Sequence, residues 1–212
     1  LGEIILVDDG STLSDLGPRL DRYVAALPKV RLHRHGKRLG LVRGRLTGIG
    51  LARTTTATVL DSHIEVQEGW LEPLMARLAH NPTHVVFPQI DSIDQMTFRP
   101  EAGGIGCTLG FLWQLVEHAI PTQRKDAARL RTAIDPIPSP THAGGLFALN
   151  REYFHSIGGY DTEFGFWGAE NLEFSFRIWQ CGGVLEGVPC SRFSSFFRKG
   201  GKPYTSPGDH AT

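Results

Sequence analysis

The chain has 212 residues, of which 41% are hydrophobic and 21% are charged, and its formal net charge at pH 7 is zero. This composition is sufficient for one globular domain with a substantial core, and without a basic excess it gives no reason to expect nucleic acid or an anionic membrane surface as a partner. No apolar run approaches the ~20 residues that span a bilayer, and the three cysteines allow at most one internal disulfide.

The first half of the chain alternates between short apolar runs and amphipathic segments. The runs predict strands at residues 3–7, 30–33, 57–60 and 85–88, and the amphipathic segments predict helices at residues 13–27, 40–52 and 69–79. Strands that alternate with helices favour a parallel sheet.

The second half begins with residues 91–140, which are rich in Gly, Pro and polar side chains and contain one predicted helix at roughly residues 122–132. A strand is then predicted at 144–149, a helix beginning at 150–157, a helix at 169–181 and a last strand after 182–185. In the helix at 169–181 we expect Leu172, Phe174, Phe176, Ile178 and Trp179 to pack inward. From residue 199 onward the composition indicates a loop or mobile lid.

Acidic residues follow two of the predicted strands. Asp8 and Asp9 end the first strand, and Asp61 and His63 follow the strand at 57–60. Because ligands of open α/β sheets bind at the carboxyl ends of strands, we expect these groups to converge on one edge. A carboxylate and an imidazole can hold a divalent cation, and the cation can hold a diphosphate. The alternative is that residues 61–63 form an ordinary turn.

A second polar motif, WGAENLE at residues 167–173, places Glu170 and Asn171 in the first turn of a helix. With the cation site, it suggests an enzyme that binds a nucleotide-sugar through a metal. Candidate phosphate or base contacts, each weighed against a solvated surface charge, are Arg38, Arg43, Arg45, Arg198, Lys199 and Lys202. The histidines other than His63 show no ligand spacing, and most are expected at the surface.

Five segments occur in an order that resembles the polypeptide N-acetylgalactosaminyltransferases, the enzymes that begin mucin-type O-glycosylation. They are EIILVDD at 3–9, LDSH at 60–63, GWLEPL at 69–74, AGGLF at 143–147 and WGAENLEFSFRIWQCGG at 167–183. The resemblance covers nearly the whole chain, and residues 171–183 are close to a family signature.

The resemblance implies an α/β GT-A glycosyltransferase fold, with a central mostly parallel sheet flanked by helices. It assigns residues 1–198 to a catalytic domain that is incomplete at its N-terminus, and residues 199–212 to the start of a flexible catalytic loop. It also implies transfer of GalNAc from UDP-GalNAc to Ser or Thr of polypeptides with retention at the anomeric carbon. The implied cofactor is Mn²⁺ on the diphosphate, held by Asp61 and His63.

The same resemblance implies roles for further residues. Asp9 and Arg38 match positions that contact the nucleoside, Ser62 lies beside the metal pair, and Arg45 and Gly145 match the surroundings of the donor sugar. The expected catalytic group is Glu170, Asn171, Trp167, Arg198 and Tyr204. Phe111 and Trp113 are expected to line the groove for the acceptor peptide.

The chain departs from the family pattern at the metal site. Ser195 stands where family members carry a histidine, the third metal ligand, and Ala169 replaces a usual glycine. Two hypotheses therefore remain: an active transferase, and a catalytically weak or inactive relative that acts as a binding or regulatory protein. A processive glycan synthase of a related fold is disfavoured, since it usually needs membrane helices and an Asp-x-Asp pair.

The resemblance also predicts a location. It implies a Golgi membrane protein whose catalytic domain faces the lumen, with a membrane anchor before residue 1 and, normally, a lectin domain after residue 212. Cys181 and Cys190 match cysteines that bridge to partners outside this sequence, which is consistent with a secretory compartment.

Overall fold

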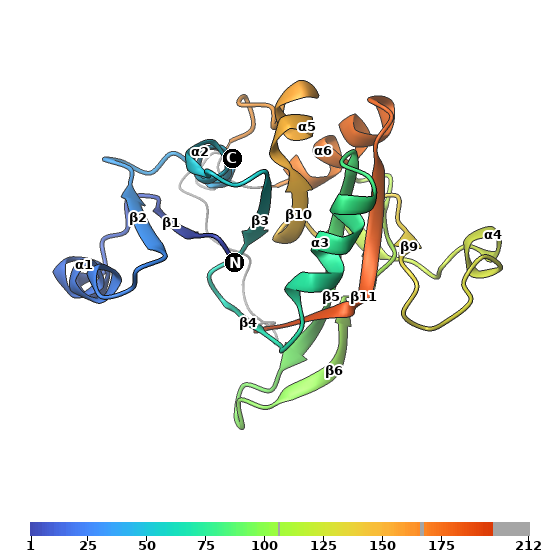
Figure 1. The fold of residues 1–212 in the computed structure, drawn as a ribbon, viewed down its shortest axis with the longest axis horizontal. Helices are drawn as coiled ribbons and strands as arrows, with labels where there is room; N and C mark the ends of the chain where they lie inside the picture. The colour runs from blue at the N-terminus through green and yellow to red at the C-terminus, as the bar shows by residue number, and fades with distance from the viewer. Residues whose placement is uncertain (106, 166–167, 197–212) are drawn as a thin grey trace.

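The computed structural model describes residues 1–105, 107–165 and 168–196 (Figure 1). Within these residues seven strands form one sheet, in the order β3–β10–β5–β11–β4, with β6 paired to β5 and β9 paired to β11. Their bounds are β3 Thr56–Leu60, β4 Ile64–Val66, β5 His84–Ile93, β6 Pro100–Ile105, β9 Ile137–Pro138, β10 Leu146–Asn150 and β11 Val184–Ser195.

The sheet is mixed, so the expectation of a mostly parallel sheet is wrong. Only β5 and β11 run parallel within it, whereas β10 is antiparallel to both β3 and β5, and β4, β6 and β9 also join antiparallel. The parallel pair expected from the first half is a separate one, β1 (Ile4–Asp8) with β2 (Val30–Arg34). Antiparallel neighbours need no helical crossover, so alternation of strands and helices does not reveal them.

The helices lie close to where the sequence predicts them. They are α1 Pro18–Ala25, α2 Leu41–Leu51, α3 Leu71–His80, α5 Arg151–Ser156 and α6 Glu170–Gln180. The predicted helix at 13–27 is divided into a 3₁₀ turn, Ser14–Leu16, and α1, because Pro18 occupies the first helical position, where it is favoured. The helix expected at 122–132 shortens to α4, Arg124–Ala127, and a small hairpin of β7 (Leu109–Phe111) and β8 (Glu117–Ala119) precedes it.

Two hydrophobic clusters cover the two faces of the sheet. On one face Phe87 of β5 packs with Phe174 and Ile178 of α6, and on the other face Val86 packs with Leu74 of α3. Successive residues of β5 point to opposite faces, so this strand is buried on both sides. Figure 1 shows α3 lying across the sheet beside β5 and β11. The expectation for Trp179 is wrong, since its side chain is 40% exposed and its indole N–H donates to the Pro140 carbonyl.

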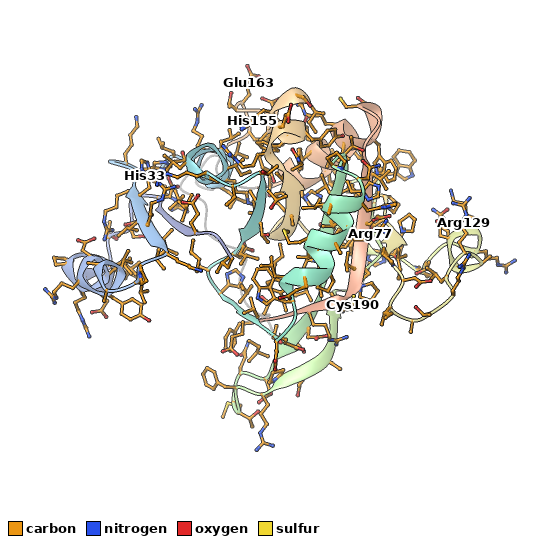
Figure 2. All side chains as sticks on the ribbon, in the orientation of Figure 1. His33, Arg77, Arg129, His155, Glu163 and Cys190 are labelled. Carbon is orange, nitrogen blue, oxygen red and sulfur yellow. The ribbon has the colours of Figure 1, made fainter. Side chains whose placement is uncertain are left out.

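An ion pair also fixes α3 to the sheet. Arg77, labelled in Figure 2, donates from Nε and Nη2 to the two carboxylate oxygens of Glu186 on β11, at 2.9 and 3.0 Å. A two-point guanidinium–carboxylate contact sets orientation as well as distance. It therefore specifies how α3 lies on the strand whose far end, Ser195, reaches the candidate metal site.

The aromatic core centred on Phe174 gives a test of this packing. Its ring lies 6.0 Å from Phe147, 5.5 Å from Phe154 and 4.8 Å from Tyr160, measured between centroids. Phe174→Ala is expected to lower the free energy of unfolding by about 3–5 kcal/mol, because the cavity adds to the lost burial. Urea denaturation checks this against Met96→Ala, whose side chain is 88% exposed and whose loss is expected to change little; equal effects would contradict the assigned core.

Candidate active site

Asp61 follows β3 directly and is held against the first residues before β10. Its backbone N–H donates to the Gly145 carbonyl at 3.1 Å, which continues the antiparallel pairing of Leu60 with Leu146. A Cβ atom on Gly145 would lie 2.3 Å from Asp61 Oδ2. The position of this carboxylate therefore requires glycine at 145.

Gly144 allows a second side chain to pack closely against the same backbone segment. Its φ is +68°, a conformation that favours glycine, and an added Cβ would lie 2.8 Å from the Cβ of Asn171. The two glycines thus allow Asp61 and Asn171 to approach one short stretch of backbone, and this brings the end of β3 close to the start of α6.

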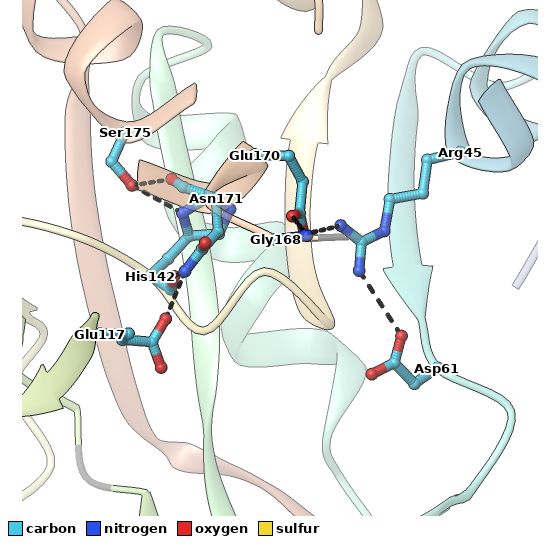
Figure 3. A network of polar contacts seen from close by, with 8 residues as sticks. All are labelled: Arg45, Asp61, Glu117, His142, Gly168, Glu170, Asn171 and Ser175. Atoms are coloured by element: carbon cyan, nitrogen blue, oxygen red, sulfur yellow. Dashed lines mark hydrogen bonds and ion pairs between the residues drawn. The ribbon is translucent and has the colours of Figure 1, made fainter. Parts of the chain in front are cut away.

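A buried arginine joins these two elements (Figure 3). Arg45 of α2 donates from Nη1 to Glu170 Oε1 at 3.1 Å, and its Nη2 lies 3.6 Å from Asp61 Oδ1. The other carboxylate oxygen of Glu170 accepts the Gly168 N–H at 3.1 Å. Burial raises the pKa of Asp61, and the charges of Arg45 and His63 oppose that rise.

The predicted metal pair lies on the turn between β3 and β4. Residues 62–63 form the turn, so the alternative interpretation is correct for the backbone, but it leaves Ser62 and His63 exposed beside Asp61. The antiparallel pairing of β4 with β11 places Ser195 opposite Ile64, the residue after His63. The third predicted position is therefore next to the pair, as a buried hydroxyl.

The donor set at this turn suits an oxygen-preferring divalent cation. A carboxylate, an imidazole and a hydroxyl are ligands that Mn²⁺ accepts. Among the described residues no group of three His, Cys, Asp or Glu side chains is placed to hold a metal. With serine at 195, the charged and imidazole ligands number two, Asp61 and His63, and water would have to complete the coordination.

Asn171 belongs to a hydrogen-bonded group that continues the network. Its Nδ2 donates to Glu117 Oε2 and, at 3.0 Å, to the His142 carbonyl. Ser175 Oγ contacts His142 Nδ1 at 2.9 Å and donates to the Asn171 carbonyl at 2.6 Å. Burial, helped by the charge of Arg45, lowers the pKa of His142 to about 3, so this histidine stays neutral.

His142 and Glu117 are participants that sequence reasoning missed. His142 is fully buried, contrary to the expectation for most histidines, and Glu117 comes from the Gly- and Pro-rich region where one helix was expected. The position of His142 just before AGGLF was the one available signal. Burial, with the charge of Glu170, raises the pKa of Glu117 to about 7, although the Asn171 hydrogen bond opposes that rise.

Asp9 contacts the loop that leads into α2. The Asp9 carboxylate accepts the N–H groups of Leu39 and Gly40 at 2.9 and 2.8 Å and contacts His35 Nδ1 at 2.8 Å. Burial on its own would raise the pKa of Asp9, but the three hydrogen bonds outweigh it and hold that pKa below its usual range.

The acidic residues at the end of β1 and after β3 are expected to converge, but among the described residues the structure records no direct contact between them. Asp8 contacts Arg34 of β2, and Asp9 fixes the loop that carries Arg38 and leads into α2. It is α2 that reaches the second strand end, through Arg45. The predicted nucleoside and metal positions are thus linked by a helix rather than by a recorded contact between carboxylates.

The two predicted acceptor residues form an exposed aromatic surface beside the network. Phe111 is 36% exposed and Trp113 is 93% exposed, with their ring centroids 6.4 Å apart, and Phe111 also lies 5.1 Å from Phe176. Phe111 pairs across the hairpin with Glu117. Three predicted site residues, Trp167, Arg198 and Tyr204, lie outside the described residues.

Ala169, at the N-terminal end of α6, adopts an unusual backbone conformation. Its φ is +60°, in the left-handed region that favours glycine. Its side chain makes no cap hydrogen bond, and its carbonyl accepts the N–H groups of Leu172 and Glu173, both at 3.1 Å. This explains why a glycine is expected here and shows that the alanine is accommodated with strain.

Comparisons with known proteins bear on the whole chain. A sequence model described as glycosyl transferase family 2 matches residues 2–158, and one described as the N-terminal domain of galactosyltransferase matches residues 129–199. Mouse polypeptide N-acetylgalactosaminyltransferase 12 is 48% identical over 206 residues, which cover 94% of this chain and 35% of that protein. Mouse polypeptide N-acetylgalactosaminyltransferase 4 is 47% identical over 214 residues, covering 98% and 36%.

A solved structure agrees with these relatives. The crystal structure of GalNAc-T7 with UDP, GalNAc and Mn²⁺ superimposes with a TM-score of 0.90 at 35% identity, covering 97% of this chain and 40% of that one. The chain spans about a third of the length of the curated relatives it matches.

The buried arginine is expected to be essential for folding. Arg45→Met leaves Glu170 buried without its cation, and we expect a loss of about 3–5 kcal/mol in the free energy of unfolding. Arg43→Met on the same helix is the matched control, because Arg43 is exposed and contacts only the Thr162 carbonyl among the described residues. Urea denaturation at pH 7 measures both, and similar midpoints for the two variants would refute the role given to Arg45.

The strained position gives an opposite expectation. Ala169→Gly is expected to raise the free energy of unfolding by about 0.5–1 kcal/mol, since glycine adopts positive φ without the Cβ clash but loses more chain entropy on folding. Ala148→Gly, in buried extended backbone, is the control and should be destabilising. Thermal unfolding separates the two, and destabilisation by both would contradict the assigned conformation.

Proposed function

Because the chain matches the glycosyl transferase family 2 model over most of its length and belongs to the polypeptide N-acetylgalactosaminyltransferases, we propose that it is the GT-A catalytic domain of a retaining transferase. The reaction is transfer of GalNAc from UDP-GalNAc to Ser or Thr of polypeptides. The observation that carries the proposal is the chain of contacts from Asp61 through Arg45 to Glu170 and its neighbour Asn171. It places the predicted metal and donor-sugar residues in one network beside an exposed aromatic surface.

The donor would be held from two sides. Asp61 and His63 would hold Mn²⁺, the ion present with UDP and GalNAc in the GalNAc-T7 structure, with Ser195 and water as neutral ligands. When bound, the cation supplies charge stabilisation to the departing UDP. On the nucleoside side, Asp9 fixes the loop that presents Arg38.

The donor sugar would lie against the glycine pair and the start of α6. Gly145 is buried and leaves room for the Asp61 carboxylate to pack against its backbone, and Glu170 and Asn171 are already fixed by Arg45 and by the His142 carbonyl. Groups held in place before the substrate binds do not have to reorganise during reaction. By resemblance, Trp167, Arg198 and Tyr204 complete the donor site.

The acceptor peptide would lie on Phe111 and Trp113. Exposed aromatic side chains at the edge of a site favour contact with an apolar partner surface, and Phe111 faces Glu117 and hence Asn171 across the hairpin. The acceptor hydroxyl would attack on the face that UDP leaves. The contribution of the protein is then positioning and electrostatic stabilisation, with no protein nucleophile.

One observation favours a second candidate function. With serine at 195, the predicted metal site at the turn between β3 and β4 has two charged or imidazole ligands among the described residues. Weakened metal binding would make the protein a binding or regulatory relative. The chain is 48% and 47% identical to two proteins named polypeptide N-acetylgalactosaminyltransferases over nearly its whole length, which favours the transferase. Metal dependence of activity decides between the two functions.

The proposal includes the Golgi lumen as the site of action. Cys181 and Cys190 are exposed, as bridges to cysteines elsewhere in a full-length protein would require, and such bridges form in secretory compartments. No helix within the described residues is long and apolar enough to cross a membrane. The resemblance places the anchor in the segment that precedes this domain.

Restoring the third ligand tests the metal site. Ser195→His in the full-length protein is expected to lower the Mn²⁺ concentration for half-maximal GalNAc transfer to a Thr- and Pro-rich peptide by about 10-fold or more, since imidazole binds Mn²⁺ better than a hydroxyl. Ser195→Ala, which removes the hydroxyl without adding a ligand, should require more Mn²⁺ than the natural protein. Asp61→Asn should abolish transfer.

The outcomes separate the two candidate functions. Transfer by the natural protein supports an active enzyme with Ser195 and water as adequate ligands. Transfer only after Ser195→His favours the binding or regulatory relative. If UDP affinity does not depend on Mn²⁺ in any folded variant, the transferase proposal fails.

A further inference from the structure

The side-chain amide of Asn171 is held by two acceptors on opposite elements. Its Nδ2 donates to Glu117 Oε2 on β8 and to the His142 carbonyl just before β10 (Figure 3). An amide nitrogen carries two hydrogens, so both are used. The atom left for a substrate is the carbonyl oxygen, Oδ1, to which the structure records no hydrogen bond from the described residues.

The two hydrogen bonds of Asn171 Nδ2, to Glu117 and to the His142 carbonyl, form a clamp on the amide. The His142 side of this clamp is fixed independently of pH. Ser175 Oγ donates its proton to the backbone carbonyl of Asn171, so it must accept a hydrogen bond from His142. His142 therefore carries its proton on Nδ1. The ring also packs edge-on against Phe147, with centroids 4.9 Å apart. Because burial keeps His142 neutral, this part of the clamp does not change in the neutral pH range.

The Glu117 side has a different character. Its half-buried carboxylate lies on the strand that pairs with Phe111 of the acceptor surface, and its hydrogen bond to Asn171 is the one recorded for it among the described residues. An ionised carboxylate only accepts hydrogen bonds, so it holds Nδ2 toward itself. A protonated carboxyl also donates, and it competes for Oδ1.

We propose that Glu117 is a positioning residue of the transferase: its carboxylate fixes the amide of Asn171 so that Oδ1 faces the substrate and accepts a hydroxyl hydrogen there. This inference rests on the proposed function. The resemblance that assigns the donor-site residues does not include Glu117. This residue reaches Asn171 from the β7–β8 hairpin, which also carries Phe111. Glu117 thus connects the acceptor surface to the donor site through one side chain.

The charged groups around Glu117 favour titration in the neutral range. Glu170 on α6 and burial both disfavour its charge, which raises the pKa to about 7. Arg45 on α2 is committed to Glu170 and Asp61, and His142 is neutral. His118 is the next residue on β8, where alternation turns it to the other face, and it is exposed.

The expected sign follows from the two forms of the carboxyl. Ionised Glu117 locks the amide, so transfer should rise as pH increases through about 7. Because the pKa is raised in the folded protein, Glu117 also lowers stability progressively as pH rises from the unfolded pKa to the folded one. The loss of stability is therefore nearly complete once the pH reaches the folded pKa of about 7, whereas the rise in activity is centred on that pKa.

Two variants separate the charge of Glu117 from its shape. Glu117→Gln keeps an oxygen that accepts from Asn171 but cannot ionise, so its kcat should lose the rise between pH 6 and 8. Glu117→Ala removes the acceptor, and kcat should fall about 10-fold at pH 8, a typical effect for a group that orients another, with KM for the peptide changed less. His118→Ala is the control and should keep the natural pH profile.

A measurement without turnover keeps the inference separate from the proposed function. In the full-length protein, the ¹⁵N–¹H signals of the Asn171 side-chain amide, assigned by their loss in Asn171→Asp, should shift with pH near 7 and stop shifting in Glu117→Gln. An amide that is insensitive to pH in the natural protein, or equally sensitive in both, would overturn the role of Glu117. A titrating amide without transfer at any pH would confirm the clamp and refute the transferase.

Discussion

The site depends on one buried cation between two acids. Arg45 places its guanidinium between Glu170 and Asp61 with its side chain 7% exposed, and each of the three groups comes from a different element. Glu170 is buried and Asp61 is half-buried, and without the cation both carboxylates would ionise poorly. The arginine therefore makes it possible for α2, β3 and α6 to meet, and their meeting point is where the donor sugar would lie.

Two glycines make the same meeting point geometrically possible. Asp61 and Asn171 both contact the backbone at residues 144–145, and a single Cβ atom on either glycine would collide with one of them. Both glycines are themselves buried, and the side chains of Asp61 and Asn171 fill the space that a Cβ atom would need. The glycines therefore allow Asp61 and Asn171 to pack against the same short backbone segment.

The turn between β3 and β4 shows how the fold places the third predicted metal position. The pairing of β4 with β11 brings residue 195 beside His63, and the bidentate contact of Arg77 with Glu186 aligns α3 with β11. The strand pairing thus keeps residue 195 next to the predicted metal pair, with a serine hydroxyl in place of the imidazole that the resemblance implies. Under the proposed function, this difference concerns metal affinity rather than the fold.

By itself the sequence determined the apolar strands and amphipathic helices of the first half, the location of Asp61 and His63 after β3, the start of α6 and, through its motifs, the family. These features are local, because each depends on the spacing of a few adjacent residues. The roles expected for Trp167, Arg198 and Tyr204 stay predictions.

Only the tertiary structure decided the antiparallel pairings of β10, the partners of Asp9, and the contacts of His142 and Glu117. Arg45 and Glu170 are 125 residues apart in the chain, and Glu117 and Asn171 are 54 apart. Short strands such as β4, β7 and β8 are stabilised by their neighbours rather than by their own pattern. Burial, which sets the charge of His142 and Glu117, exists only once those distant segments have packed together.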